Sequence, residues 1–299
     1  MLFPGFEAST IRTRGASIHL VAGGEGPPVL LLHGYPETHA MWHKVAPALA
    51  RDFTVVCADL RGYGDSSKPK GLPDHSNYSK RAMAADMVEV MHKLGHASFH
   101  LVGHDRGARV AHRLARDHAK RVRTLAVLDI SPTLKMYQAT DMAFATAYYH
   151  WFFLIQPAPL PEKLLAKDVP GYILGRIGRG KRGLKPFSAA ARREYVRAFR
   201  DPRTVHATCE DYRAAATIDL AHDRRDRRRK LAMPVLVLWG RHGVIERLFD
   251  PLRDWREVAR RVSGRALPCG HFIPEEASRQ TLAELRRFLG GFEKWRKNA

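Results

Sequence analysis

Ser98-Phe-His-Leu-Val-Gly103-His104-Asp105-Arg106-Gly107 is the stretch that decides the fold of this 299-residue chain. Its first half is a short apolar run, which predicts a buried strand, and residues 108–119 continue in a helical pattern. Between them, a Gly-x-Asp-x-Gly turn predicts a sharp bend, because flanking glycines let the backbone turn tightly and leave the middle side chain projecting alone. Asp105 is therefore the first candidate for a reactive group.

Similar apolar runs occur on both sides of this turn, at residues 28–33, 53–58, 123–129 and 234–239. Continuous apolar runs are typical of parallel strands that are covered on both faces. Between two of them, Met83, Met87 and Met91 recur at helical spacing, which predicts a helix with one buried face. The sequence therefore predicts an α/β fold with a mostly parallel, doubly wound sheet.

The alternation of strands and helices stops after Asp129. Residues 131–230 contain no comparable apolar run and instead carry aromatic-rich helical stretches at 144–153 and 192–199. We expect a core formed by residues 1–130 and 231–299, with a helical insertion at 131–230 between two of its strands.

The composition excludes several classes of protein. With 45% hydrophobic residues, the chain can bury a core, and no apolar run approaches the ~20 residues of a membrane span. Lys and Arg exceed Asp and Glu by 50 to 30, a net charge of +20, but acids interrupt the densest basic run at 223–230. Nucleic acid is therefore not the expected partner. Three scattered cysteines and no visible secretory signal favour a cytoplasmic location.

Two further segments lie where a reactive Asp105 would need them. Tyr35, in a His-Gly-Tyr-Pro loop after the strand at 28–33, is expected to offer its backbone N–H to an oxyanion. His271 follows a glycine in a loop before the last helix, at about 276–292, and is the candidate base. Asp129 ends its strand and is the best candidate to orient His271, with Glu246 the weaker competitor.

These segments, together with Arg61-Gly-Tyr-Gly-Asp-Ser66, resemble the α/β-hydrolase superfamily over nearly the whole chain. In that superfamily the insertion would be a cap domain. A serine that attacked a saturated carbon would form an ether, which ordinary hydrolysis could not release. Aspartate attack leaves an ester, which water can cleave, so Asp105 favours displacement at a carbon that bears a halogen or an epoxide oxygen.

The residues after Asp105 narrow the choice between a halogenated substrate and an epoxide. Asp105-Arg106-Gly-Ala-Arg109 resembles the fluoroacetate (haloacetate) dehalogenases, and two guanidinium groups beside the nucleophile suit a substrate carboxylate. The resemblance implies a halide site formed by His150, Trp151 and Tyr212. One departure is that residues 171–183 lack a tryptophan that members of the family tend to carry there, which leaves substrate size open.

The expected reaction is the hydrolysis of a small anionic 2-haloacetate with no metal or organic cofactor and no membrane partner. The preferred halide and a homodimeric state are left open. Two alternatives remain at this point: an epoxide hydrolase in which Tyr148, Tyr149 or Tyr212 protonates the opening ring, and a non-catalytic hydrolase-like binding protein.

Overall fold

The computed structural model describes residues 2–298, and its centre is an eight-stranded sheet with the order β1-β2-β4-β3-β5-β6-β7-β8. The strands are β1 (Glu7–Arg12), β2 (Ser17–Gly23), β3 (Pro28–Leu32), β4 (Thr54–Ala58), β5 (Phe99–His104), β6 (Val122–Leu128), β7 (Leu231–Gly240) and β8 (Ala259–Leu267). Strand β2 pairs antiparallel with β1 and β4, and all other pairs are parallel. The predicted α/β fold with a mostly parallel sheet is confirmed.

Helices cover both faces of this sheet. They are α1 (Ala46–Leu49), α2 (Lys80–Lys93), α3 (Asp105–Asp117), α12 (Val244–Leu248), α13 (Pro251–Val258), α14 (Ile273–Glu276) and α15 (Ser278–Asn298), with short 3-10 turns at His39–Lys44, Ser76–Tyr78 and Ala119–Arg121. Helix α2 packs on α3, which in turn packs on β5 and β6. Met83, Met87 and Met91 of α2 are fully buried, as their spacing predicts.

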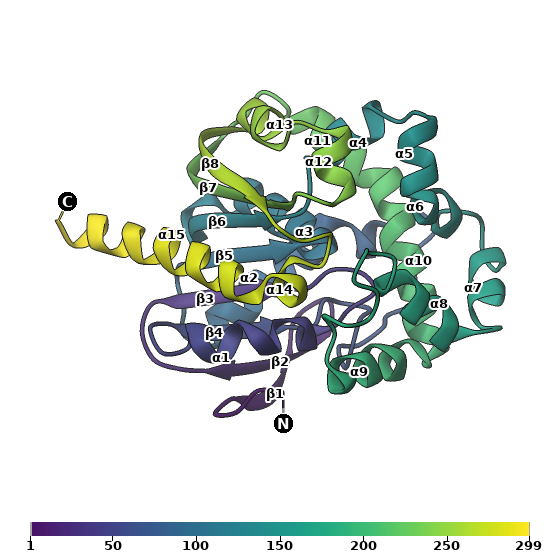
Figure 1. The fold of residues 1–299 in the computed structure, drawn as a ribbon, viewed down its shortest axis with the longest axis horizontal. Helices are drawn as coiled ribbons and strands as arrows, with labels where there is room; N and C mark the ends of the chain where they lie inside the picture. Colours follow the sequence, from purple (N-terminus) through teal and green to yellow (C-terminus); the bar gives the residue numbers. More distant parts are fainter. Residues whose placement is uncertain (1, 299) are drawn as a thin grey trace.

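Between β6 and β7 the described chain forms helices and no strand. These helices are α4 (Thr133–Gln138), α5 (Met142–Ala147), α6 (Tyr149–Leu154), α7 (Leu160–Leu165), α8 (Val169–Ile177), α9 (Ala189–Phe199), α10 (Pro202–Ala216) and α11 (Ile218–Asp226). We call residues 133–226 the helical segment. In Figure 1 its helices α5 to α10 gather on the right of the molecule, beside the ends of the central strands.

Sequence patterns missed the two strands at one edge of the sheet. Strand β1 is almost wholly exposed, and β2 alternates between buried and partly exposed residues, so neither forms a continuous apolar run. Alternation of this kind is typical of antiparallel strands with one solvated face. The last helix is also longer than expected, and Ala277 separates it from the short helix α14.

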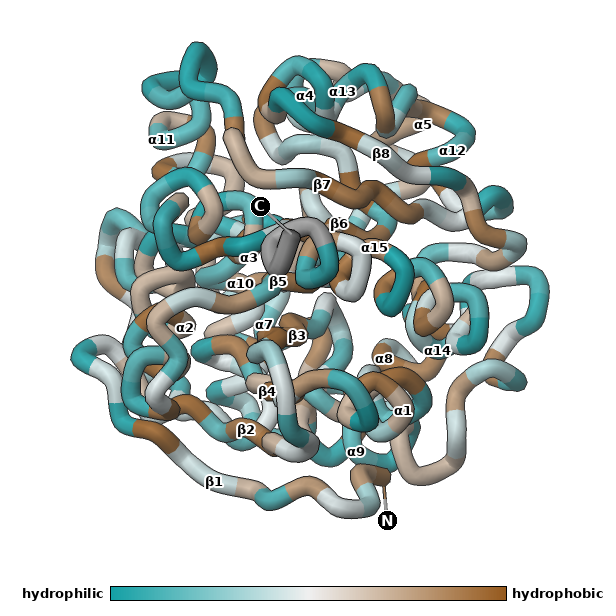
Figure 2. Tube along the Cα trace, turned by 90° about the vertical axis from the view of Figure 1, so that its left-hand side faces the viewer, coloured by the Kyte–Doolittle hydropathy of each residue, from teal (hydrophilic) through white to brown (hydrophobic). Residues whose placement is uncertain are grey.

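The central strands carry the hydrophobic core. Every residue of β3 and β5 is buried, which is what coverage on both faces requires. Figure 2 shows hydrophobic colours along the central strands and hydrophilic colours at the periphery. None of the described helices is long and apolar enough to cross a membrane.

Candidate active site

Asp105 lies at the tight turn between β5 and α3. Its φ of +43° is in the left-handed region, which a non-glycine residue adopts only when its surroundings enforce it. The flanking glycines provide the space: a Cβ on Gly107 would lie 2.4 Å from the carbonyl oxygen of His33, and one on Gly103 would lie 2.6 Å from the backbone nitrogen of Ala108. The turn therefore depends on both glycines and holds the Asp105 side chain at the carboxyl end of the sheet.

The surroundings of Asp105 keep its carboxylate ionised. Burial alone would raise the pKa of Asp105, but electrostatic interactions with His271 and Arg109 outweigh burial and hold that pKa below its usual range. The backbone N–H of Tyr35 donates a hydrogen bond of 3.2 Å to Oδ2. One carboxylate oxygen is therefore held by the chain, while Oδ1 has no such bond among the described residues.

Asp129 orients His271. Its Oδ2 lies 2.6 Å from Nδ1 of His271, and its Oδ1 accepts the backbone N–H of Gly240 at 2.8 Å. Asp129 is almost fully buried, whereas the imidazole is 21% exposed, so a water molecule can approach the ring. The weaker competitor, Glu246, instead accepts a hydrogen bond from the indole N–H of Trp239. Hence the structure brings Asp129 and His271 together, beside Asp105, and engages Glu246 elsewhere.

A second histidine, His104, connects the loops that carry these residues. His104 Nδ1 lies 3.3 Å from a carboxylate oxygen of Glu37, and its Nε2 donates to the carbonyl oxygen of His271 at 2.8 Å. Burial alone would lower the pKa of His104, but the adjacent carboxylate of Glu37 raises it to about 9. A charged His104 thus links the Tyr35 loop, the Asp105 turn and the His271 loop.

Arg106 has only one nitrogen left for a ligand. Its Nε and Nη2 each donate at 2.8 Å to the carboxylate of Asp211, which Lys80 also binds. Its Nη1 is buried and has no hydrogen-bond partner among the described residues. Asp211 therefore occupies one edge of the Arg106 guanidinium, and Nη1 is the nitrogen left for the carboxylate that Arg106 is predicted to bind.

Arg109 is held in a comparable way. Its Nη1 donates to the hydroxyl of Thr133 at 2.9 Å, and its Nη2 contacts the sulfur of Met136 at 3.2 Å. The guanidinium carbon lies 4.7 Å from the centre of the Trp151 ring, a cation–π distance. Nε of Arg109 is the nitrogen without a partner in the described chain.

The helical segment brings His150, Trp151 and Tyr212 to the same place. His150 and Trp151 lie on α6 and Tyr212 lies on α10, all three buried. The ring centres of His150 and Tyr212 are 5.8 Å apart, and the Tyr212 ring lies 4.0 Å from the guanidinium carbon of Arg106. Burial and the nearby charge of Asp105 raise the pKa of Tyr212 well above its usual value, so its hydroxyl remains a donor.

Unsatisfied donors are the unusual feature of this site. Buried polar atoms in proteins nearly always have hydrogen-bond partners. Here the following atoms have none among the described residues: Arg106 Nη1, Arg109 Nε, His150 Nδ1, Trp151 Nε1 and Tyr212 Oη. Such a set of donors beside a carboxylate suits a small ligand that brings acceptors, namely an anion with a second electronegative group.

A pocket of about 550 Å³ borders this site. Its lining includes His271 and Arg247 from the part of the chain that follows β7, and Tyr148 and Arg176 from the helical segment. Its cationic lining favours anionic molecules.

Two residues of the site, Asp211 and Arg176, were not among the predicted site residues. Asp211 binds Arg106, and Nη2 of Arg176 lies 2.9 Å from Nε2 of His150. A buried aspartate in α10 could have been expected to have a cationic partner, but the sequence does not say which one. Arg176 belongs to a glycine- and arginine-rich stretch in which nothing distinguishes it from its neighbours.

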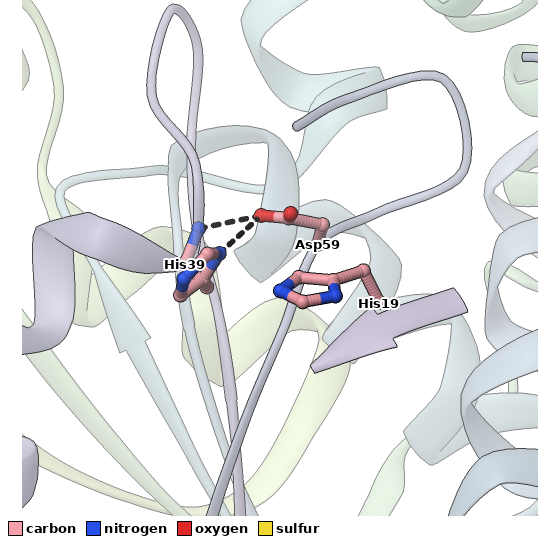
Figure 3. A group of neighbouring side chains, drawn as sticks. All are labelled: His19, His39 and Asp59. Atoms are coloured by element: carbon pink, nitrogen blue, oxygen red, sulfur yellow. Dashed lines mark hydrogen bonds and ion pairs between the residues drawn. The ribbon is translucent and has the colours of Figure 1, made fainter. Parts of the chain in front are cut away.

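A second cluster of polar side chains lies at the end of β4. His19, His39 and Asp59 have ligand-type atoms within 4.8 Å of one another, and Figure 3 shows both imidazoles near the carboxylate, with dashed lines from His39 alone. Oδ1 of Asp59 accepts the backbone N–H and the ring Nδ1 of His39, at 2.7 and 3.0 Å, and Oδ2 accepts the N–H of Asp65. These bonds use both carboxylate oxygens and tie neighbouring loops together, which gives the cluster a structural role.

Comparison with known families and proteins agrees with this geometry. The family model of the alpha/beta hydrolase fold matches residues 27–278. A fluoroacetate dehalogenase from Burkholderia sp is 47% identical over 289 residues, which span 96% of this chain and 95% of that protein.

Two further relatives widen the comparison. A soluble epoxide hydrolase from Corynebacterium sp. (strain C12) is 35% identical over 266 residues, 88% of this chain and 90% of that protein. Among solved structures, an alpha/beta hydrolase from Nostoc sp PCC 7120 superposes with a TM-score of 0.95 at 58% identity, covering 97% of this chain and 99% of that one.

Proposed function

Because the chain belongs to the α/β-hydrolase fold family and to its haloacetate dehalogenases, we propose that it converts 2-haloacetates to glycolate and halide through an ester on Asp105. That the chain is a hydrolase acting on carbon–halide bonds follows from its 47% identity to the Burkholderia enzyme over 96% of its length. The observation that supports the finer proposal is the set of buried, unpartnered donors around an ionised Asp105.

Substrate binding uses the cationic donors. The carboxylate of the haloacetate accepts hydrogen bonds from Nη1 of Arg106 and Nε of Arg109, which offsets the repulsion between two anions. The halogen is then directed toward the indole N–H of Trp151, the hydroxyl of Tyr212 and the ring N–H of His150. These donors stabilise the charge that develops on the departing halide.

Displacement proceeds from the free oxygen of Asp105. Oδ1 attacks the α-carbon opposite the halogen, a carbon–oxygen bond forms as the carbon–halogen bond breaks, and the halide leaves with the electron pair. The product is an ester in which Oδ2 is the carbonyl oxygen, still bound by the N–H of Tyr35.

Hydrolysis releases the product. Nε2 of His271, oriented by Asp129, takes a proton from a water molecule that attacks the carbonyl carbon of the ester. The oxyanion on Oδ2 is held by the N–H of Tyr35 and by the N–H of Arg106, which lies in the first turn of α3, where a helix has no internal acceptor. Collapse of the intermediate breaks the bond between the carbonyl carbon and Oδ1, glycolate takes the proton from His271, and the second proton of the water is released to solvent as the Asp105 carboxylate is restored.

We also propose that residues 131–230 act as a cap domain over a core of residues 1–130 and 231–299. The cap would supply the halide donors, while the core supplies the nucleophile and the base.

The epoxide alternative is the second candidate, because a related epoxide hydrolase is 35% identical and Tyr212 is a buried, protonated hydroxyl beside Asp105. A neutral epoxide, however, would leave the free nitrogens of Arg106 and Arg109 buried without an acceptor, which is costly. That cost favours an anionic substrate.

The test is to incubate the purified protein separately with fluoroacetate, chloroacetate and styrene oxide, and to measure free halide, glycolate and diol. We expect equal amounts of halide and glycolate, and no release by Asp105→Ala with an unchanged circular dichroism spectrum. Diol formation without halide release would support the epoxide alternative, and no turnover of any substrate would support a binding protein.

A further inference from the structure

Arg176 makes a contact that decides which nitrogen of His150 carries a proton. Its Nη2 lies 2.9 Å from Nε2 of His150. A guanidinium group can only donate hydrogen bonds, so Nε2 must be the acceptor and cannot itself carry a proton. Burial, followed by the charge of Arg176, lowers the pKa of His150 well below its usual value, so the ring is neutral and its one proton resides on Nδ1.

The protonated nitrogen is the one left without a partner. His150 is buried, and its Nδ1 has no hydrogen-bond partner in the described part of the chain. The ring stacks on Tyr35 at 6.0 Å and meets Tyr212 edge-on at 5.8 Å, so it lies among the side chains that surround Asp105. The arginine thus occupies one side of the ring and leaves an N–H donor on the other.

We propose that Arg176 is a positioning residue that holds His150 in the Nδ1–H tautomer, so that this histidine donates a hydrogen bond to the departing halide. The inference rests on the proposed function for the identity of the leaving group, but the tautomer itself follows from the contact alone. In the other tautomer, Nδ1 would present a lone pair to the halide and repel it.

Arg176 also strengthens the donor that it selects. A cation hydrogen-bonded to Nε2 withdraws electron density from the ring and polarises the Nδ1–H bond, as in other hydrogen-bond chains. Fluoride is compact and the poorest leaving group of the halides, so its release depends most on such donors. We therefore expect Arg176 to matter more for fluoroacetate than for bromoacetate.

The activity test replaces Arg176 by leucine and by lysine. In Arg176→Leu we expect kcat for fluoroacetate to fall by about tenfold or more, in line with a hydrogen bond to a charged group, and kcat for bromoacetate to fall less. KM should change little, because the carboxylate contacts at Arg106 and Arg109 remain. Arg176→Lys keeps a cationic donor and should recover part of the loss. Arg193→Leu, which removes an exposed arginine of α9, is the matched control.

The tautomer is measured directly with long-range ¹H–¹⁵N correlation spectra of ¹⁵N-histidine-labelled protein, in which His150→Gln assigns the signal. We expect a protonated Nδ1 in the wild type and in Arg193→Leu, and an Nε2–H or mixed pattern in Arg176→Leu. An unchanged tautomer in Arg176→Leu would overturn the proposal even if haloacetates are substrates. A changed tautomer with equal losses for both halides would overturn the role in halide release. Failure of the wild type to release any halide would contradict the proposed function, while the spectra would still decide whether Arg176 sets the tautomer.

Discussion

The two sides of the site are built in different ways. On the sheet side, Asp105, Asp129 and His271 each follow a strand, and short hydrogen bonds and an ion pair fix the loops that carry them. On the helical side, His150, Trp151 and Tyr212 lie within helices, and each has one buried polar atom with no partner among the described residues.

This difference separates two tasks. The sheet side holds groups that must stay in register with one another while bonds form and break, so their positions are fixed before the substrate arrives. The helical side keeps donors unsatisfied, which costs stability in the empty protein and is recovered when a ligand supplies acceptors. We therefore expect changes on the sheet side to stop the reaction, and changes on the helical side to alter which halide is released best.

The largest effect is expected for His271→Asn on the sheet side. Displacement does not need the base but ester hydrolysis does, so steady-state turnover should fall by about 10³-fold or more. Rapid-quench measurement should still show one equivalent of halide per active site, and intact mass spectrometry should show the ester on the peptide that contains Asp105. If prolonged exposure to substrate leaves the protein unmodified, His271 has another role.

Arg109→Leu tests whether Arg109, which lies between the two sides, binds the substrate carboxylate. Loss of one partner of a buried charge pair typically costs 2–5 kcal/mol, so kcat/KM for chloroacetate should fall by about 10²-fold. Chloroacetamide, which carries no charge, serves as the internal control and should lose much less. Equal losses for the acid and the amide would mean that Arg109 has only a structural role, through Thr133 and Met136.

Tyr212→Phe on the helical side should change selectivity more than overall activity. The variant keeps the ring beside Arg106 and removes only the hydroxyl, so we expect about a tenfold loss in kcat for fluoroacetate and a smaller loss for chloroacetate. The ratio of the two rates, measured by halide release, is the readout. Proportional losses would show that the hydroxyl does not distinguish the halides.

The smallest expected effect is on the stability of the folded protein, and it concerns the pair formed by His104 and Glu37 on the sheet side. Because Glu37 raises the pKa of His104 to about 9, protonation of His104 contributes stability that is fully present below the ordinary histidine pKa of 6.5 and is lost as the pH rises through 9. The melting temperature of the wild type should therefore decrease between pH 7 and pH 10. His104→Gln should be less stable at pH 7 and should show a flatter decrease, whereas parallel curves for the two proteins would contradict the assignment.

The sequence predicted the sheet side better than the helical side, for a physical reason. Asp105 and its glycines lie within five consecutive residues, and Asp129 and His271 end strands or follow them, so local patterns locate all three. The partnership of Arg106 with Asp211 spans 105 residues and depends on where α10 lies relative to α3 in the folded chain. No local pattern encodes such a contact, and the same holds for Arg176 and His150. Likewise, β1 and β2 escaped prediction because their exposed faces interrupt the apolar pattern.

The bond between the N–H of Tyr35 and Oδ2 of Asp105 makes the two carboxylate oxygens inequivalent over successive turnovers. In the proposed reaction Oδ1 leaves with glycolate, and an oxygen atom from water takes its place, while Oδ2 remains bound to Tyr35. As long as the carboxylate does not rotate, the oxygen at the Oδ1 position is replaced in every turnover, whereas the oxygen at the Oδ2 position is retained. The oxygen delivered to each glycolate is then the one that entered the enzyme from water in the previous cycle. An oxygen isotope supplied in the water therefore reaches glycolate one turnover after it enters the protein.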